Sequence, residues 1–177
     1  MRLPSKRALS WAFYDWGNSA FATTVMAGFF ALYFKSYSNA GVSSDVSTFR
    51  LGVCYSLSGV VVALLAPLLG AVSDRSGNRK SLLFVFTGIG VISTALLAAP
   101  GEGQWFFAAM VFFFSLVGFN GAIVFYDAML PEAAEGDSPD FVSSLGYSLG
   151  YLGGGLLFAV NVLMYLKPEW WGISSSG

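Results

Sequence analysis

Histidine is absent from this sequence of 177 residues, and cysteine occurs once, as Cys54. The missing histidine excludes His-based catalysis, proton relays through imidazole groups and most zinc sites. A single cysteine excludes an intrachain disulfide and leaves the redox compartment open. We therefore expect no metal centre and no cofactor, and we interpret Cys54 as a small packing residue.

Charged side chains are also scarce. They make up 11% of the residues, whereas a soluble domain has about 25%. The formal net charge is −1, and the sequence has no cluster of basic residues, so we expect no nucleic-acid partner. The scarcity of charge indicates instead a chain whose partner is the lipid bilayer.

Long segments without any charged residue account for most of the chain. Five such runs cover residues 16–34, 51–73, 81–101, 103–126 and 141–166. A helix needs roughly 20 apolar residues to cross the hydrocarbon core, and each run is of that length. The sequence therefore predicts an all-α polytopic membrane protein with one incomplete N-terminal bundle over residues 1–177. We place its five transmembrane helices at about 11–34, 51–73, 81–99, 104–128 and 142–166.

Lysine and arginine predict the orientation of these helices, because they are in excess on the cytoplasmic side. Six lie on the side of the N-terminus: Arg2, Lys6, Arg7, Arg75, Arg79 and Lys80. Three lie on the other side: Lys35, Arg50 and Lys167. We therefore expect a cytoplasmic N-terminus. The first apolar run is too long for a signal peptide, and the ending KPEWWGISSSG leads us to expect the front part of a longer protein.

The stretch FYDWGNSAF, residues 13–21, carries polar groups into the first predicted span. Asp15 follows Trp11 by four residues, which is about 6 Å at 1.5 Å per residue, so it lies near the inner interface. Four further side chains follow on its helical face at spacings of three or four residues: Asn18, Ser19, Thr23 and Met26. A polar face in a transmembrane helix normally faces protein or water. We expect this face to line a solute cavity; the alternative is that Asp15 only anchors the start of the helix.

The fourth predicted span carries a second pair of polar residues. It runs from outside to inside, so Asp127 arrives at the same membrane level as Asp15, and Asn120 lies about two turns deeper. The alternative for Asp127 is a salt bridge to Arg75 or Arg79. The six cavity candidates are Asp15, Asn18, Ser19, Thr23, Asn120 and Asp127.

Glycine is concentrated in the fifth predicted span, in GYSLGYLGGG. We name four of these as helix-packing glycines: Gly146, Gly150, Gly153 and Gly154. Close helix packing in lipid favours small residues, but a helix that moves during a conformational cycle would also use them, and both interpretations stay open. Small residues on one face of the second span also predict a close helix contact: Ser56, Gly59, Ala63, Ala66 and Gly70.

A short charged loop, GAVSDRSGNRKSLL, joins the second and third predicted spans. Asp74 and Arg75 lie at the membrane boundary, a turn follows at Gly77, and Arg79 and Lys80 anchor the next span on the inside. Anchoring by positive charge alone requires neither the acid at Asp74 nor the glycine at Gly77.

This loop resembles the signature between the second and third helices of major facilitator superfamily transporters. In that signature a glycine is followed four residues on by Asp-Arg, then by glycine and a basic pair. The matching residues are Gly70, Asp74, Arg75, Gly77 and Arg79. The resemblance implies that they form an inner-loop latch of ion pairs and hydrogen bonds that stabilises the outward-facing state.

Three other segments resemble the vacuole-effluxer branch of that superfamily, which contains autophagy-related vacuolar amino-acid exporters. They are YDWGNSAF, FYDAMLPE and SLGYSLGYLGGGLL. The resemblance implies a twelve-helix major facilitator fold, of which this chain is the first part and the missing C-terminal helices are the partner. It also implies a bacterial inner membrane or a vacuolar membrane as the location.

These patterns favour a secondary active transporter, not an enzyme, that moves a small polar solute, with amino acids as the first candidate, by alternating access. A non-transporting membrane subunit is the alternative. An intramembrane aspartyl protease also needs two Asp residues on different spans, one of them after Tyr. Tyr14-Asp15 and Tyr126-Asp127 both meet the requirement for an Asp after a Tyr, but the motif that carries the second Asp of such proteases, Gly-x-Gly-Asp, is absent.

Overall fold

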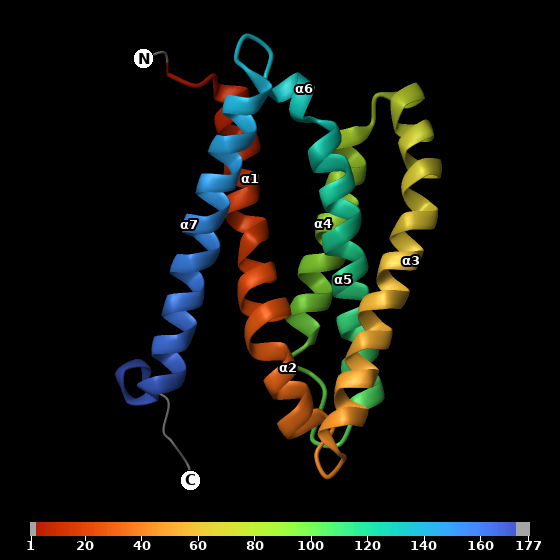
Figure 1. Cartoon of the computed structure of the whole chain (residues 1–177), viewed down its shortest axis with the longest axis vertical. Coiled ribbons are helices and arrows are strands. Elements are labelled where there is room, and N and C mark those ends of the chain that lie inside the picture. The colour runs from red at the N-terminus through yellow and green to blue at the C-terminus, as the bar shows by residue number, and fades with distance from the viewer. Residues whose placement is uncertain (1–2, 173–177) are drawn as a thin grey trace. The chain divides into compact units, whose positions relative to one another are not determined.

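A computed structural model describes residues 3–172, which form helices and no strand (Figure 1). In chain order the elements are α1 (Lys6–Ala20), the π-helical segment η1 (Phe21–Phe29), α2 (Phe30–Tyr33), the π-helical segment η2 (Phe34–Ser38), α3 (Ser44–Ser76), α4 (Arg79–Leu96), α5 (Trp105–Ala128), α6 (Leu130–Ala133), α7 (Pro139–Leu166) and the 3-10 turn η3 (Pro168–Trp171). Within the described range, α3, α4, α5 and α7 are long and apolar enough to cross a membrane. An all-helical, multi-pass membrane protein is thus confirmed, and the count of five spans stays a prediction.

The first predicted span differs from a plain α-helix. The chain is helical from Lys6 to Ser38 without a break, but two π-helical segments, η1 and η2, interrupt the α-helical hydrogen-bond pattern. A π-helix bonds each N–H to the carbonyl five residues earlier, so each turn holds more than 3.6 residues. Side chains beyond Thr23 therefore leave the helical face on which α-helical spacing places them.

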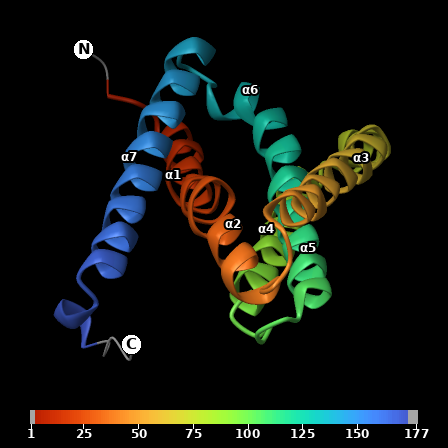
Figure 2. The same ribbon diagram turned by 60° about the horizontal axis from the view of Figure 1, so that its bottom comes forward.

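The chain divides into two compact units, each of which is described by itself. Unit 1 comprises Met1–Phe30 with Glu132–Gly177, and unit 2 comprises Ala31–Pro131. In unit 1, α1 and α7 lie side by side over most of their length (Figures 1 and 2). In unit 2, α4 and α5 form the most extensive helix contact, and α3 packs on α5.

The contact between α4 and α5 depends on two glycines that bring the helix backbones together. A Cβ atom built on Gly118 of α5 would lie 2.3 Å from the backbone nitrogen of Gly90 on α4. One turn further, the ring of Phe86 fills the space in front of Gly121 and stacks on Phe125, with 5.7 Å between ring centroids. The core of unit 2 is therefore an α4–α5 seam closed at glycine and sealed by aromatic rings.

The packed face of α3 differs from the face that small residues predicted. Cys54 of α3 is buried with its Sγ atom 3.6 Å from the carbonyl oxygen of Ala109, and Tyr55 meets the ring of Phe112 edge-on. Ser56, Gly59 and Ala63 are exposed instead. Within this chain α3 therefore packs through the face of Cys54 and Tyr55, and the close helix contact expected at the small residues stays a prediction.

Gly118→Ala is expected to lower the free energy of unfolding by about 1–3 kcal/mol, because the new methyl group meets backbone atoms of α4 that have no room to shift. Gly88→Ala on α4 is the matched control, since a Cβ there meets nothing within 4 Å. Thermal unfolding of the full-length protein in detergent measures both variants. Equal melting temperatures for the two would contradict this account of the seam.

Candidate functional site

A polar face of the first helix lies against α7 in unit 1. Asp15, Ser19 and Thr23 follow one another at successive turns, and the Ser19 hydroxyl donates to Asp15 Oδ1 at 3.4 Å. Thr23 Oγ1 lies 3.0 Å from the carbonyl oxygen of Ser19 and 3.1 Å from that of Gly154 on α7, so its one proton can serve either acceptor. Hydrogen bonds between membrane helices contribute about 0.6 kcal/mol on average. This polar face therefore both packs on α7 and forms a hydrogen bond with it.

The glycines of α7 make this close approach possible. A Cβ built on Gly150 would lie 2.7 Å from both Asp15 Oδ2 and Ser19 Oγ, and one built on Gly153 would lie 2.5 Å from the carbonyl oxygen of Trp16. All four named packing glycines are buried on α7: Gly146, Gly150, Gly153 and Gly154. Three of the cavity candidates, Asp15, Ser19 and Thr23, thus contact a neighbouring helix of the same unit.

The other three cavity candidates lie away from this seam. Asn18 is half-buried on α1, and Asn120 is half-buried on α5 in unit 2. Neither amide side chain hydrogen-bonds to another described residue, so both can receive an external polar group. Asp127 is exposed near the end of α5. The lining of a cavity by these residues stays a prediction.

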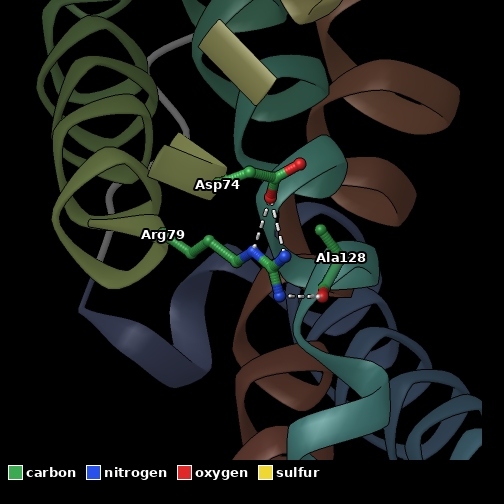
Figure 3. A network of polar contacts seen from close by, with 3 residues as sticks. All are labelled: Asp74, Arg79 and Ala128. Atoms are coloured by element: carbon green, nitrogen blue, oxygen red, sulfur yellow. Dashed lines mark hydrogen bonds and ion pairs between the residues drawn. The ribbon is translucent and has the colours of Figure 1, made fainter. Parts of the chain in front are cut away.

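The loop between α3 and α4 holds an ion pair at its centre (Figure 3). Gly77 ends α3 with φ +66°, a left-handed conformation that favours glycine, and its N–H bonds to the carbonyl of Ser73 at 2.9 Å. This sharp turn brings Arg79 back to Asp74, with Nη2 at 2.7 Å and Nε at 3.2 Å from Oδ1. The left-handed turn therefore explains why position 77 of the predicted latch is a glycine.

The same arginine also ties this loop to α5. Arg79 Nη1 donates to the carbonyl oxygen of Ala128 at 3.2 Å, at the C-terminal end of α5 where helix carbonyls lack partners (Figure 3). Arg75 is exposed and forms no ion pair with the described residues, and neither does Asp127. The alternative of a salt bridge from Asp127 to Arg75 or Arg79 is wrong, because Arg79 is engaged by Asp74 and the helix end.

A second polar cluster, at the opposite end of α3, was not predicted. Arg50 Nη1 donates to Asn39 Oδ1, and its guanidinium lies 3.6 Å above the ring of Trp105 on α5. Asn39 is only 1% exposed and donates through Nδ2 to Ser47. In the sequence, Arg50 stands out only as a basic residue at the start of an apolar run, and we used it only to predict the orientation of the helices.

The acidic loop before α7 has its basic partners in the N-terminal segment. Arg7 forms an exposed ion pair with Glu135, and the backbone N–H of Ser5 donates to Asp137 Oδ2 at 3.1 Å. Ser5 also accepts from the N–H of Ala8 and so caps α1. Among residues 3–172, no three acidic or Cys side chains lie close enough to hold a metal ion.

Comparison with known proteins identifies the family. The sequence profile of the family described as "Vacuole effluxer Atg22 like" matches residues 38–139, from the end of η2 to the start of α7. This chain belongs to that family. The resemblance to the vacuole-effluxer branch of the major facilitator superfamily is thereby confirmed.

Two relatives of this vacuole effluxer-like chain match nearly all of it. YxiO, an uncharacterized MFS-type transporter of Bacillus subtilis (strain 168), is 36% identical over 170 residues, which are 96% of this chain and 40% of YxiO. An uncharacterized protein of Aquifex aeolicus (strain VF5) is 28% identical over 173 residues, 95% of this chain and 42% of that protein. The chain thus spans less than half the length of these curated relatives. No solved structure gives a significant match.

Gly153→Ala is expected to destabilise the α1–α7 seam, because the added methyl group would meet the backbone carbonyl of Trp16. Gly155→Ala is a closely matched control, since a Cβ at Gly155 meets nothing within 4 Å. We expect the first variant to lose about 1–3 kcal/mol of stability. The second should lose none, in thermal unfolding of the full-length protein. A Gly153→Ala variant as stable as the control would show that the seam is looser than described.

Proposed function

We propose that the full-length protein is a secondary active transporter that moves a small polar solute across a membrane by alternating access. The observation that carries this proposal is the similarity to the MFS-type relative, which extends over 96% of the chain. Membership in the vacuole effluxer-like family supports it. Neither comparison favours the aspartyl protease alternative.

The inner loop supports an alternating-access mechanism through its geometry. Arg79 holds the end of α3 through Asp74 and the end of α5 through Ala128, so one side chain links three helices on the predicted cytoplasmic side. The Arg79 side chain is 30% exposed and that of Asp74 is 64% exposed. Such a pair contributes about 0–1 kcal/mol. It is therefore weak enough to break and re-form within a transport cycle.

We assign contact with the solute to the half-buried amide of Asn18 in unit 1; the amide of Asn120 in unit 2 stays a separate candidate. An amide offers both donors and an acceptor, which suits a zwitterionic or otherwise polar solute. Amino acids are the first candidate, because the vacuole-effluxer branch includes amino-acid exporters. In this proposal Asp15, Ser19 and Thr23 orient the first helix on α7, the N-terminus is cytoplasmic, and the solute passes beside Asn18.

Flux through the full-length protein in proteoliposomes tests the proposal, with a broad panel of amino acids and other small polar solutes on one side. Asn18→Leu is expected to lower the rate of flux about tenfold or more, which corresponds to about 1.4 kcal/mol of lost interaction. The amount of inserted protein should hardly change, because leucine suits a lipid environment. Parallel loss of flux and of inserted protein would contradict the role of Asn18. Absence of flux for every amino acid would contradict the amino-acid assignment.

Arg79→Gln tests the latch separately from the cavity. We expect a several-fold change in the flux rate with little change in melting temperature, because a partly exposed ion pair contributes about 0–1 kcal/mol to stability. Lys80→Gln is the matched control, since Lys80 is an exposed cation next to Arg79 that lies outside the predicted latch and forms no ion pair with the described residues. Equal flux in both variants would contradict the latch.

A further inference from the structure

The first helix contacts α7 with an irregular spacing. On α7 the contact positions are Gly150, Gly154 and Phe158, each four residues after the last, as an α-helix requires. On the first helix, Ser19 faces Gly150 and Thr23 bonds to Gly154, but the residue that lies against Phe158 is Gly28, five residues after Thr23. A Cβ on Gly28 would lie 2.8 Å from the ring of Phe158. One of the two partners therefore carries an extra residue between neighbouring turns.

The extra residue lies in η1, Phe21–Phe29, whose last bond runs from the N–H of Phe30 to the carbonyl of Val25, five residues earlier. At the start of the segment, the N–H of Phe21 bonds instead to the carbonyl of Asn18, three residues earlier. A π-helical turn inside an α-helix is equivalent to the insertion of one residue, and such turns concentrate at functional sites. In the first helix, a tight turn at Phe21 is thus followed by the wide π-helical turn that ends at Phe30.

One polar group of η1 has no hydrogen-bond partner among the described residues. Thr23 Oγ1 reaches the carbonyl of Ser19 four residues earlier, which is the usual bond of threonine in a helix. Thr24 Oγ1 is buried and makes no hydrogen bond with the described residues. Closure to α-helical geometry would bring the carbonyl of Ala20, four residues before Thr24, into the corresponding position. The π form therefore gains the contact of Gly28 with α7 but lacks a bond that the α form can make.

We propose that η1 is a switch in the first membrane helix that closes from π to α geometry during the transport cycle. Closure transfers one residue out of the turn, so the helix on one side rotates by about 100° and moves by about 1.5 Å relative to the other side. Asp15 and Ser19 then leave their positions on Gly150, which the flat glycine surface of α7 permits. The role of the switch rests on the proposed transport function.

Deletion of Ala27 from the full-length protein removes the extra residue, so the first helix keeps the α7 contacts of the π form but has no wide turn left to close. Ala27 is the exposed residue of η1, and its removal sets Thr23 and Gly28 four residues apart, so both keep their contacts with α7 across a regular α turn. We expect the variant to insert and to melt at or above the wild-type temperature. We expect its solute flux to fall about tenfold or more, as for loss of a required step.

Deletion of Gly17 is the matched control. Gly17 is also exposed, and a Cβ there meets nothing within 4 Å, but it lies in the regular turn between Asp15 and Ser19. Its loss puts every residue on one side out of register with α7, so the melting temperature should fall. Equal destabilisation by the two deletions would overturn the proposal, and so would wild-type flux in a stable Ala27 deletion.

Amide hydrogen exchange gives a readout that does not depend on flux. Residues 21–30 should exchange faster than residues 8–19 in the wild type and slow down in the Ala27 deletion. If the wild type moves no solute, the proposed transport function fails. Unchanged hydrogen exchange in the Ala27 deletion would overturn the switch, whatever the flux.

If the deletion variant does not insert, Thr24→Val replaces it. Removal of the unpaired hydroxyl favours the π form, so this variant should melt higher and transport more slowly, and unchanged values overturn the proposal.

Discussion

Close approach between polar side chains of one helix and the bare backbone of another is the interaction on which unit 1 depends. In lipid, a buried polar group must find its partner within the protein, and Asp15, Ser19 and Thr23 occur on three successive turns. The glycines of α7 allow these side chains to lie against that helix, where Thr23 reaches a main-chain carbonyl. A larger residue at Gly150 or Gly153 would separate the helices and leave this polar face open to lipid.

Unit 2 meets the same constraint in a different way. Its α4–α5 seam is closed by Gly90 and Gly118 and sealed by stacked aromatic rings, so its middle is apolar. The polar contacts of its two engaged arginines lie toward the two ends of α3. Arg79 joins the helix ends at one of them, and Arg50 joins the other end to Trp105. The middle of the unit is therefore tightly packed, and the interactions that can change lie near the predicted membrane surfaces.

Several features of the site were predictable because each follows from a local pattern. The glycine spacing of residues 146–154 predicted a packed face on the fifth span, and the loop from Gly70 to Arg79 predicted a charged turn. The partner of Arg79 was not predictable, because Asp74 and Asp127 both lie at the same membrane level. The choice depends on the turn at Gly77, which directs Arg79 back to Asp74. The π segment left no trace in hydropathy, since one extra residue in a turn changes no composition.

The sequence by itself determined that this chain is a polytopic helical membrane protein and indicated the family to which it belongs. Runs of about 20 apolar residues have few other solutions in water or lipid, and the loop motif is local. Only the tertiary structure decided which faces of the helices meet. It assigned the polar face of the first helix to α7, packed α3 on α5 through Cys54 and Tyr55, and placed a π turn between Thr23 and Gly28. Those outcomes depend on the shape of the neighbouring helix, which no pattern within a single segment contains.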